Sequence, residues 1–134
     1  MSYSHGVSAK KILVVDDERD FRAIISRVLE RAGYAVVTAV DGAQALSVFA
    51  AERPDMVLLD GHLPDIDGFE VCRRLRQTEA GRAVPVVLCT VRSAISNVSE
   101  GLSAGATGYL LKPFDPAELL AAAKSALDPG GARP

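Results

Sequence analysis

The sequence has few cysteines, no excess of positive charge and no long apolar run, and each absence narrows the possible functions. Cys72 and Cys89 lie far apart within apolar segments, which indicates two buried thiols rather than a redox pair or a zinc cluster. The formal net charge of −2 provides no basic surface that would attract nucleic acid or an anionic membrane. No apolar run is long enough to span a bilayer, and the polar residues 1–10 do not resemble a signal peptide. We therefore expect a cytoplasmic protein that binds neither nucleic acid nor membrane.

A length of 134 residues suits one domain with one core. We expect this domain to span residues 11–127, between a disordered N-terminal tail at residues 1–10 and a Gly- and Pro-rich C-terminal tail at residues 128–134. No effector domain is expected after the last helix. The chain is therefore either a stand-alone domain or a piece of a longer protein.

Short apolar segments alternate with segments of helical spacing along the chain. The apolar segments are rich in β-branched residues, which is typical of strands buried on both faces of a parallel sheet. They span residues 12–15, 35–39, 56–59, 84–89 and 108–111. After the first of them, one helical stripe contains Phe21, Ile24, Ile25, Val28 and Leu29. The alternation predicts an α/β fold of five βα units, with right-handed crossovers and helices on both faces of the sheet.

Acidic residues mark the expected starts of the helices. Three pairs have the spacing of a capping box, namely Asp41 with Gln44, Asp67 with Glu70, and Asp115 with Glu118. Asp17 is expected to cap the first helix, and Gly33 to end it in a left-handed conformation. Asp65 and Asp67 form an Asp-x-Asp pair, which we interpret as loop polarity and a helix cap rather than a metal site.

Polar residues follow the strands at the ends where parallel α/β sheets place their binding sites. The residues at these ends are Asp16 and Asp17, Asp60, Thr90 and Lys112. Three crowded carboxylates repel one another unless a cation offsets their charge, and Mg²⁺ prefers such oxygen ligands. An ammonium and a hydroxyl opposite the metal could bind the remaining oxygens of a phosphoryl group. The pattern predicts a phosphoryl-transfer site in which Asp60 is a carboxylate nucleophile.

These residues lie in stretches that resemble the receiver domain of two-component response regulators. The matching stretches are VVDDE at 14–18, LLDGHLPDIDG at 58–68, Thr90, and GATGYLLKPF at 105–114. The resemblance covers residues 11–127 and implies a flavodoxin-like fold with strand order 2-1-3-4-5, like that of a chemotaxis receiver.

The resemblance implies a role for each matching residue of the acidic site. Asp60 would be the phosphoryl acceptor. Asp17 would bind Mg²⁺ directly, Asp16 largely through water, and the backbone carbonyl of His62 would be a further ligand. Lys112 would pair with the phosphoryl group.

The resemblance also implies a switch and a set of partners. Thr90 would bind a phosphoryl oxygen after activation, and Tyr109 would turn inward as Thr90 moves. The Lys112-Pro113 peptide bond is expected to be cis, as X–Pro bonds permit. The phosphoryl group would come from a histidine kinase or a phosphotransfer protein. The fourth helix, fifth strand and fifth helix would bind an output partner or a second copy. Such a receiver catalyses its own phosphorylation and dephosphorylation and is not a dedicated enzyme.

Some positions are individual to this chain. His62 and Arg92 each lie two residues after a site residue, and we hypothesise that they shield the acyl phosphate and lengthen its lifetime. Val91 follows Thr90 where the family most often has a small residue, which could restrict access to Asp60. Residues 93–104, the expected fourth helix, are rich in Ser, Asn and Gly, which favour helices weakly.

Three other interpretations are open at this point. A carboxylate-nucleophile phosphatase of the haloacid dehalogenase type would place its nucleophile on the first strand, in an Asp-x-Asp arrangement. A flavodoxin-like cofactor protein would need a phosphate-binding loop after the first strand, where this chain is acidic. A degenerate receiver would signal by protein contacts without phosphorylation, although the intact set of acids argues against it.

Overall fold

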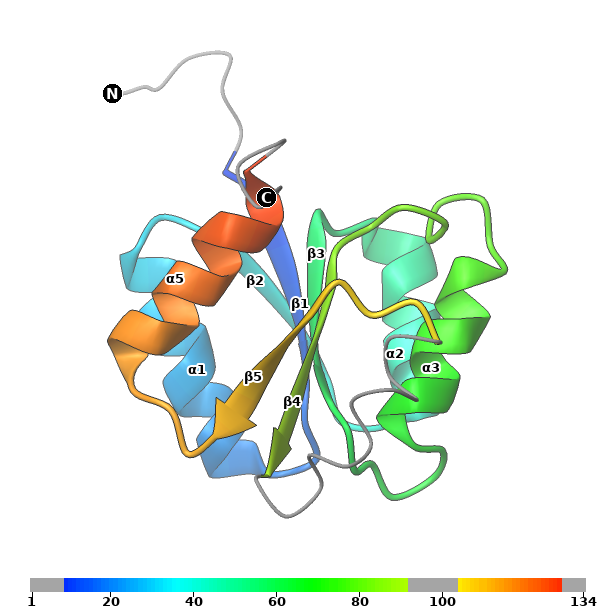
Figure 1. Ribbon diagram of the computed structural model, residues 1–134, viewed down its shortest axis with the longest axis horizontal. Helices are drawn as coiled ribbons and strands as arrows, with labels where there is room; N and C mark the ends of the chain where they lie inside the picture. Colours follow the sequence, from blue (N-terminus) through cyan, green and yellow to red (C-terminus); the bar gives the residue numbers. More distant parts are fainter. Residues whose placement is uncertain (1–8, 92–103, 129–134) are drawn as a thin grey trace.

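The computed structural model describes residues 9–91 and 104–128, in which five strands form one parallel sheet (Figure 1). The strands are β1 Lys11–Val15, β2 Ala35–Ala39, β3 Met56–Asp60, β4 Val86–Val91 and β5 Gly108–Lys112. They lie in the order β2-β1-β3-β4-β5, and every neighbouring pair is parallel. The expected α/β class and strand order are therefore confirmed.

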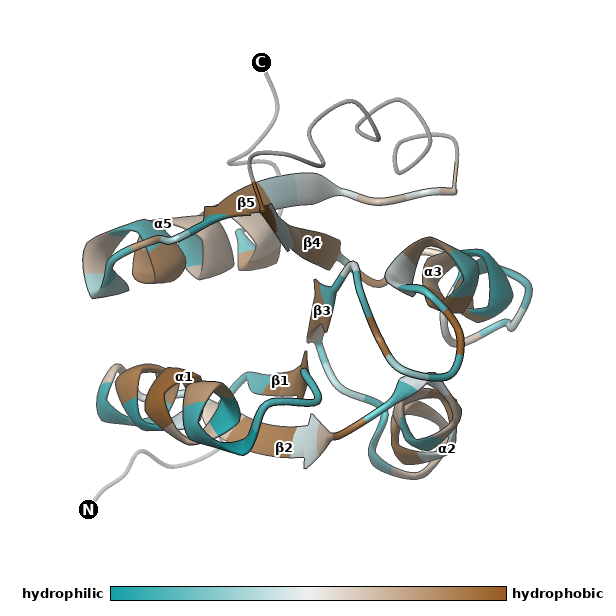
Figure 2. Cartoon of the chain, turned by 90° about the horizontal axis from the view of Figure 1, so that it is seen from below, coloured by the Kyte–Doolittle hydropathy of each residue, from teal (hydrophilic) through white to brown (hydrophobic). Residues whose placement is uncertain are grey.

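Helices cover both faces of the sheet. They are α1 Arg19–Arg31, α2 Gly42–Glu52, α3 Gly68–Arg76 and α5 Pro116–Leu127. Helices α1 and α5 lie on one face, and α2 and α3 lie on the other (Figure 2). The fourth helix expected over residues 93–104 falls, apart from Ala104, outside the described residues. Within residues 9–91 and 104–128, no helix combines the length and the apolar character needed to cross a membrane.

Apolar side chains alternate between the two faces along the central strands, so each face has its own core. Leu13, Val57 and Leu59 pack on the face of α2 and α3, whereas Met56 and Leu58 pack on the face of α1 and α5. Strand β3 is buried along its whole length because strands and helices surround it on all sides. Burial of each such side chain contributes about 1.5–3 kcal/mol to folding.

Two sequence expectations about buried residues have different outcomes. Cys72 and Cys89 are both buried free thiols, as expected. Ile24 was expected on the buried stripe of α1 but is 61% exposed, because α1 buries Ile25 and Leu29 and leaves Ile24 at the flank of the stripe.

The helix starts agree only partly with the predicted caps. Asp115 and Glu118 form the complete capping box of α5. Asp41 and Asp67 each accept the expected backbone hydrogen bond, from the amides of Gln44 and Glu70. However, the side chain of Gln44 accepts from Val40 N, and that of Glu70 pairs with Arg73 and Arg74. These two pairs therefore do not close a box.

The prediction for the start of α1 was wrong, whereas the one for its end was correct. The N-cap of α1 is Glu18, which makes no side-chain capping bond, and Asp17 therefore does not cap the helix. Gly33 follows α1 with a φ of 102°, in the left-handed region where glycine is favoured.

Candidate functional site

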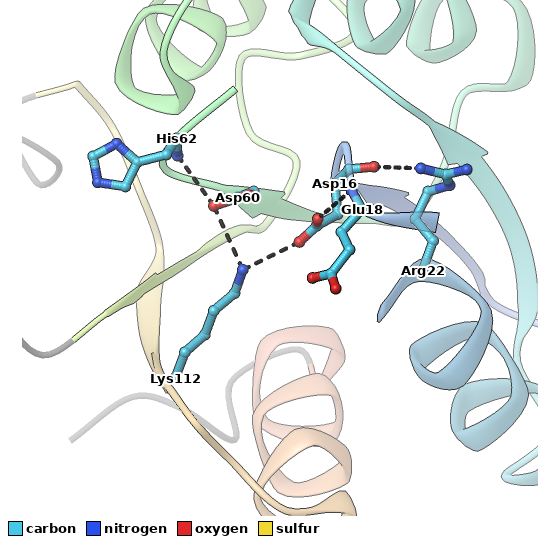
Figure 3. A network of polar contacts seen from close by, with 6 residues as sticks. All are labelled: Asp16, Glu18, Arg22, Asp60, His62 and Lys112. Atoms are coloured by element: carbon cyan, nitrogen blue, oxygen red, sulfur yellow. Dashed lines mark hydrogen bonds and ion pairs between the residues drawn. The ribbon is translucent and has the colours of Figure 1, made fainter. Parts of the chain in front are cut away.

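The carboxyl ends of β1, β3 and β5 bring two acids and one lysine together at one edge of the sheet (Figure 3). Asp16 and Asp60 are buried, with exposed fractions of 3% and 7%. The Nζ atom of Lys112 lies 3.2 Å from Asp16 Oδ2 and 3.7 Å from Asp60 Oδ1. Residues far apart in the sequence thus meet in one polar cluster, as the strand ends predicted.

A third carboxylate joins this cluster. Asp17 is exposed, and one oxygen from each of Asp16, Asp17 and Asp60 lies within 4.8 Å of the others. The single ammonium of Lys112 offsets only one of these three negative charges. Carboxylate oxygens at this spacing are hard ligands of the kind that Mg²⁺ binds, so the donor set fits a divalent cation.

Backbone and side-chain hydrogen bonds hold the two buried acids in place. Asp16 Oδ1 accepts a hydrogen bond from Glu18 N at 2.9 Å, and Asp60 Oδ1 accepts one from His62 N at 3.1 Å. Arg22 Nη1 donates to the backbone carbonyl of Asp16 at 2.8 Å. This contact was not predictable from the sequence, because six residues separate Arg22 from Asp16 and no motif connects them.

Two aromatic residues fix the position of Lys112. Its ammonium lies 4.5 Å from the centroid of the Phe21 ring, a cation–π contact from α1. Phe114 meets Phe21 edge to face, with ring centroids 5.8 Å apart. The Lys112-Pro113 peptide bond is cis, as expected. Phe21 is therefore a second residue of α1 that supports the site and that the sequence did not reveal.

The charges of the cluster shift the pKa values of its members. Burial is the largest effect on Asp60 and raises its pKa above the ordinary value. The hydrogen bond from the His62 amide and the charge of Lys112 lower this pKa. The negative charges of Asp16 and Asp17 raise it further. Burial alone would lower the pKa of Lys112, but the Asp60 and Asp16 carboxylates outweigh it and raise that pKa. A cation bound at the cluster would favour the ionised form of Asp60.

Thr90 and Tyr109 lie on the opposite face of the sheet from Lys112. Thr90 is buried, and its hydroxyl lies beside Gly61, the residue after Asp60. Tyr109 is half-buried and packs against the core under α2 and α3. It is paired with Leu88 across the two strands, and strand alternation places Thr90 on the same face as Leu88. Val91 is 39% exposed at the end of β4.

The start of α3 packs directly onto the backbone of Asp60. Gly68 N donates to Gly61 O at 3.1 Å, which closes the loop between β3 and α3 at its base. A Cβ atom at Gly68 would overlap the carbonyl oxygen of Asp60 and lie 2.9 Å from Gly61 Cα. The loop after Asp60 therefore needs glycine at position 68 for this close approach.

The remaining candidate residues lie at the rim of the site or outside the described residues. His62 is exposed, and its ring points away from Asp60 and Lys112 (Figure 3). Arg92 lies outside the described residues. Asp67 caps α3 as expected, while Asp65 binds the amides at the start of α2, a contact that the sequence did not predict.

Comparison with known proteins identifies relatives in one family. The family model of the response regulator receiver domain matches residues 12–124. The response regulator MprA of Mycolicibacterium vanbaalenii is 47% identical over 117 residues, which cover 87% of this chain and 50% of that protein. The chain thus spans about half the length of the curated relatives that it matches.

Solved structures resemble the whole fold. The chemotaxis response regulator CheY4 of Vibrio cholerae has a TM-score of 0.86 and 35% identity, with 90% of this chain and 100% of that chain covered. The receiver domain of the sensor histidine kinase PA1611 of Pseudomonas aeruginosa has a TM-score of 0.84 and 33% identity. The match covers 91% of this chain and 100% of that chain. The latter contains a magnesium ion coordinated in its active-site cleft. With its parallel sheet and its acidic cluster beside Lys112, this chain belongs to the response regulator receiver domain family.

Proposed function

We propose that the chain accepts a phosphoryl group on Asp60 from the phosphohistidine of a histidine kinase or a phosphotransfer protein, in the cytoplasm. The observation that carries this proposal is the meeting of three carboxylates with the Lys112 ammonium at one sheet edge. An oxygen of Asp60 attacks phosphorus and forms the new P–O bond. The P–N bond breaks at the same time, and its electron pair returns to the imidazole of the donor.

Asp16, Asp17, Asp60 and the backbone carbonyl of His62 would hold Mg²⁺ in this site. The magnesium ion in the PA1611 receiver domain and the spacing of the three carboxylates support this ligand set. When bound, Mg²⁺ supplies positive charge that offsets the negative charge of the phosphoryl oxygens and of the acids.

Lys112 and Thr90 bind the phosphoryl group once it is on Asp60. The ammonium lies 3.7 Å from Asp60 Oδ1, so it is placed to pair with an oxygen of a group attached there. The contact of Lys112 with the Phe21 ring limits the freedom of the side chain and supports this orientation. The Thr90 hydroxyl lies on the neighbouring strand, beside Gly61, and donates a hydrogen bond to a phosphoryl oxygen.

The conformational change begins at Thr90, continues at Tyr109 and alters a protein-binding surface. Their shared face of the sheet supports this coupling, because movement of Thr90 changes the space beside Tyr109.

The output surface includes α5 and β5. Within the described sheet, β5 pairs only with β4. A groove of about 150 Å³ lies between them and is lined by Thr107, Tyr109 and Ser125 among others. An output partner or a second copy binds there. The fourth helix, the remaining part of this surface, falls on residues that the structure does not describe apart from Ala104.

His62 and Arg92 remain proposed determinants of phosphoryl lifetime. The ring of His62 would have to turn toward Asp60 to act in this way. The double variant His62→Ala/Arg92→Ala is expected to lose the phosphoryl group faster than the wild type. An unchanged or longer lifetime would contradict this role.

A small phosphodonor with Mg²⁺, followed by intact-mass analysis, tests the proposed function. We expect the wild type to gain one phosphoryl group, and Asp60→Asn and the wild type with a chelator to gain none. A gain without metal, or one on another residue, contradicts the site assignment. No gain under any condition would instead favour a degenerate receiver that acts by protein contacts alone. Multiple-turnover release of phosphate, with an aspartyl phosphate that does not accumulate, would favour a carboxylate-nucleophile phosphatase.

A further inference from the structure

The loop between β3 and α3 is attached to α2 through the side chain of Asp65. Asp65 Oδ1 accepts a hydrogen bond from Gly42 N, and Oδ2 accepts one from Ala43 N, both at 2.8 Å. These amides belong to the first turn of α2, where backbone N–H groups have no acceptor within the helix. One carboxylate therefore connects the loop that follows Asp60 to a helix that precedes β3.

Apolar packing reinforces this attachment. Gly42 is buried beneath Ile66, the next residue of the same loop. A Cβ atom at Gly42 would overlap Ile66 Cγ1 and lie 3.0 Å from a methyl group of Val71. The absence of a side chain at Gly42 thus allows the loop to lie flat on the start of α2.

The loop is held at two points, and His62 lies between them. At its base, Gly68 N donates to Gly61 O at 3.1 Å, and at its outer side Asp65 binds α2. The amide of His62 donates to Asp60, so the backbone at His62 is part of the acidic site. Displacement of the loop from α2 would therefore move the His62 carbonyl relative to the carboxylates.

We propose that Asp65 is a positioning residue for the metal site, because it sets where the His62 carbonyl lies relative to Asp16, Asp17 and Asp60. The inference rests on the proposed function, in which that carbonyl is a ligand of Mg²⁺. Mg²⁺ requires nearly octahedral geometry, so a misplaced ligand weakens its binding. The two amide hydrogen bonds lower the pKa of Asp65 to about 2, which keeps the carboxylate ionised at neutral pH.

Titration calorimetry with MgCl₂ tests the proposal on the metal alone, without a phosphodonor. Groups that orient metal ligands contribute at least about tenfold to affinity, so we expect a dissociation constant about tenfold higher for Asp65→Ala. The matched control is Asp41→Ala, which also removes one carboxylate from the start of α2, where Asp41 Oδ1 accepts from Gln44 N at 2.8 Å. Since Asp41 does not hold the loop and salt screens its charge, the control should change affinity less than about twofold.

Gly42→Ala provides an independent test that leaves every charge in place. Its Cβ atom pushes Ile66 and the loop away from α2, so we expect weaker Mg²⁺ binding here as well. Asp65→Asn keeps one acceptor oxygen and should lie between Asp65→Ala and the wild type. Circular dichroism of each variant shows that the fold persists, and if Asp65→Ala does not fold, Asp65→Asn and Gly42→Ala decide the outcome.

The results separate this inference from the proposed function. Unchanged Mg²⁺ affinity in the folded Asp65 variants overturns the positioning role while leaving phosphorylation of Asp60 intact. An equal loss in Asp41→Ala also overturns it, because Asp65 would then act only as a helix cap or a charge. A wild type that binds no Mg²⁺ and gains no phosphoryl group overturns the proposed function itself.

Discussion

Replacing Arg76 with methionine should be among the most destabilising changes at a partly exposed position. Arg76 lies in the last turn of α3, and its guanidinium binds three backbone carbonyls. Nη1 donates to Gly81 O at 2.8 Å and to Val84 O at 2.6 Å. Nε and Nη2 donate to Gly105 O at 3.0 and 2.7 Å. One side chain thus joins α3 to the loop before β4 and to the turn before β5.

The size of the effect follows from these bonds. A hydrogen bond that involves a charged group contributes about 1.5–3 kcal/mol, but Arg76 is only partly buried and water can replace some of its bonds. Methionine also keeps the packing of the aliphatic stem. We therefore expect a loss of about 2–4 kcal/mol in the free energy of unfolding, less than the sum of four such bonds. For a chain of this length, that loss lowers the melting temperature by about 8–16 °C.

Urea denaturation and thermal melting followed by circular dichroism measure this loss, with Arg74→Met as the matched control. Arg74 lies two residues earlier on the same helix and pairs with Glu70 at 3.0 Å, but its side chain is 49% exposed. Exposed ion pairs contribute about 1 kcal/mol or less, so the control should change stability little. Equal losses in the two variants would refute the reasoning, because they would show that the carbonyl contacts of Arg76 add nothing beyond a surface charge.

The contribution of Asp65 to stability should depend on pH, since hydrogen bonds from Gly42 and from the next amide lower its pKa to about 2. This contribution is complete above the unfolded-state pKa of about 4 and is lost as the pH falls through about 2. The urea midpoint of the wild type should exceed that of Asp65→Asn at pH 7 and meet it near pH 2, and a constant difference would contradict this. Gly68→Ala should lower the free energy of unfolding by about 1–3 kcal/mol, because its Cβ overlaps the Asp60 carbonyl oxygen. Gly108→Ala, whose Cβ meets no atom within 4 Å, is the control, and equal urea midpoints for the two variants would contradict the steric argument.

The main residues of the site were predictable because the fold class determines where strand ends meet. Once the apolar segments indicate parallel strands, Asp16, Asp60 and Lys112 must approach the same sheet edge. The strand order came from the resemblance, since periodicity alone does not order five parallel strands.

The supporting contacts could not be predicted, because they join segments that share no periodic signal. Three arginines end α3, and the sequence does not distinguish Arg76, which faces the turn before β5, from Arg73 and Arg74, which pair with Glu70. Local spacing also left the helix starts ambiguous. Aspartate is a residue type that often caps helices, but Asp17 lies in the acidic cluster and does not cap α1.

The contact between Asp16 and Lys112 spans 96 residues of sequence, from the first strand to the last. During synthesis, a chain still attached to the ribosome carries its three acids long before the lysine emerges. The complete cluster can therefore form only after β5 has been synthesised. A fragment that ends before β5 would lack the ammonium that offsets the charges of Asp16 and Asp60, so its carboxylates would repel one another.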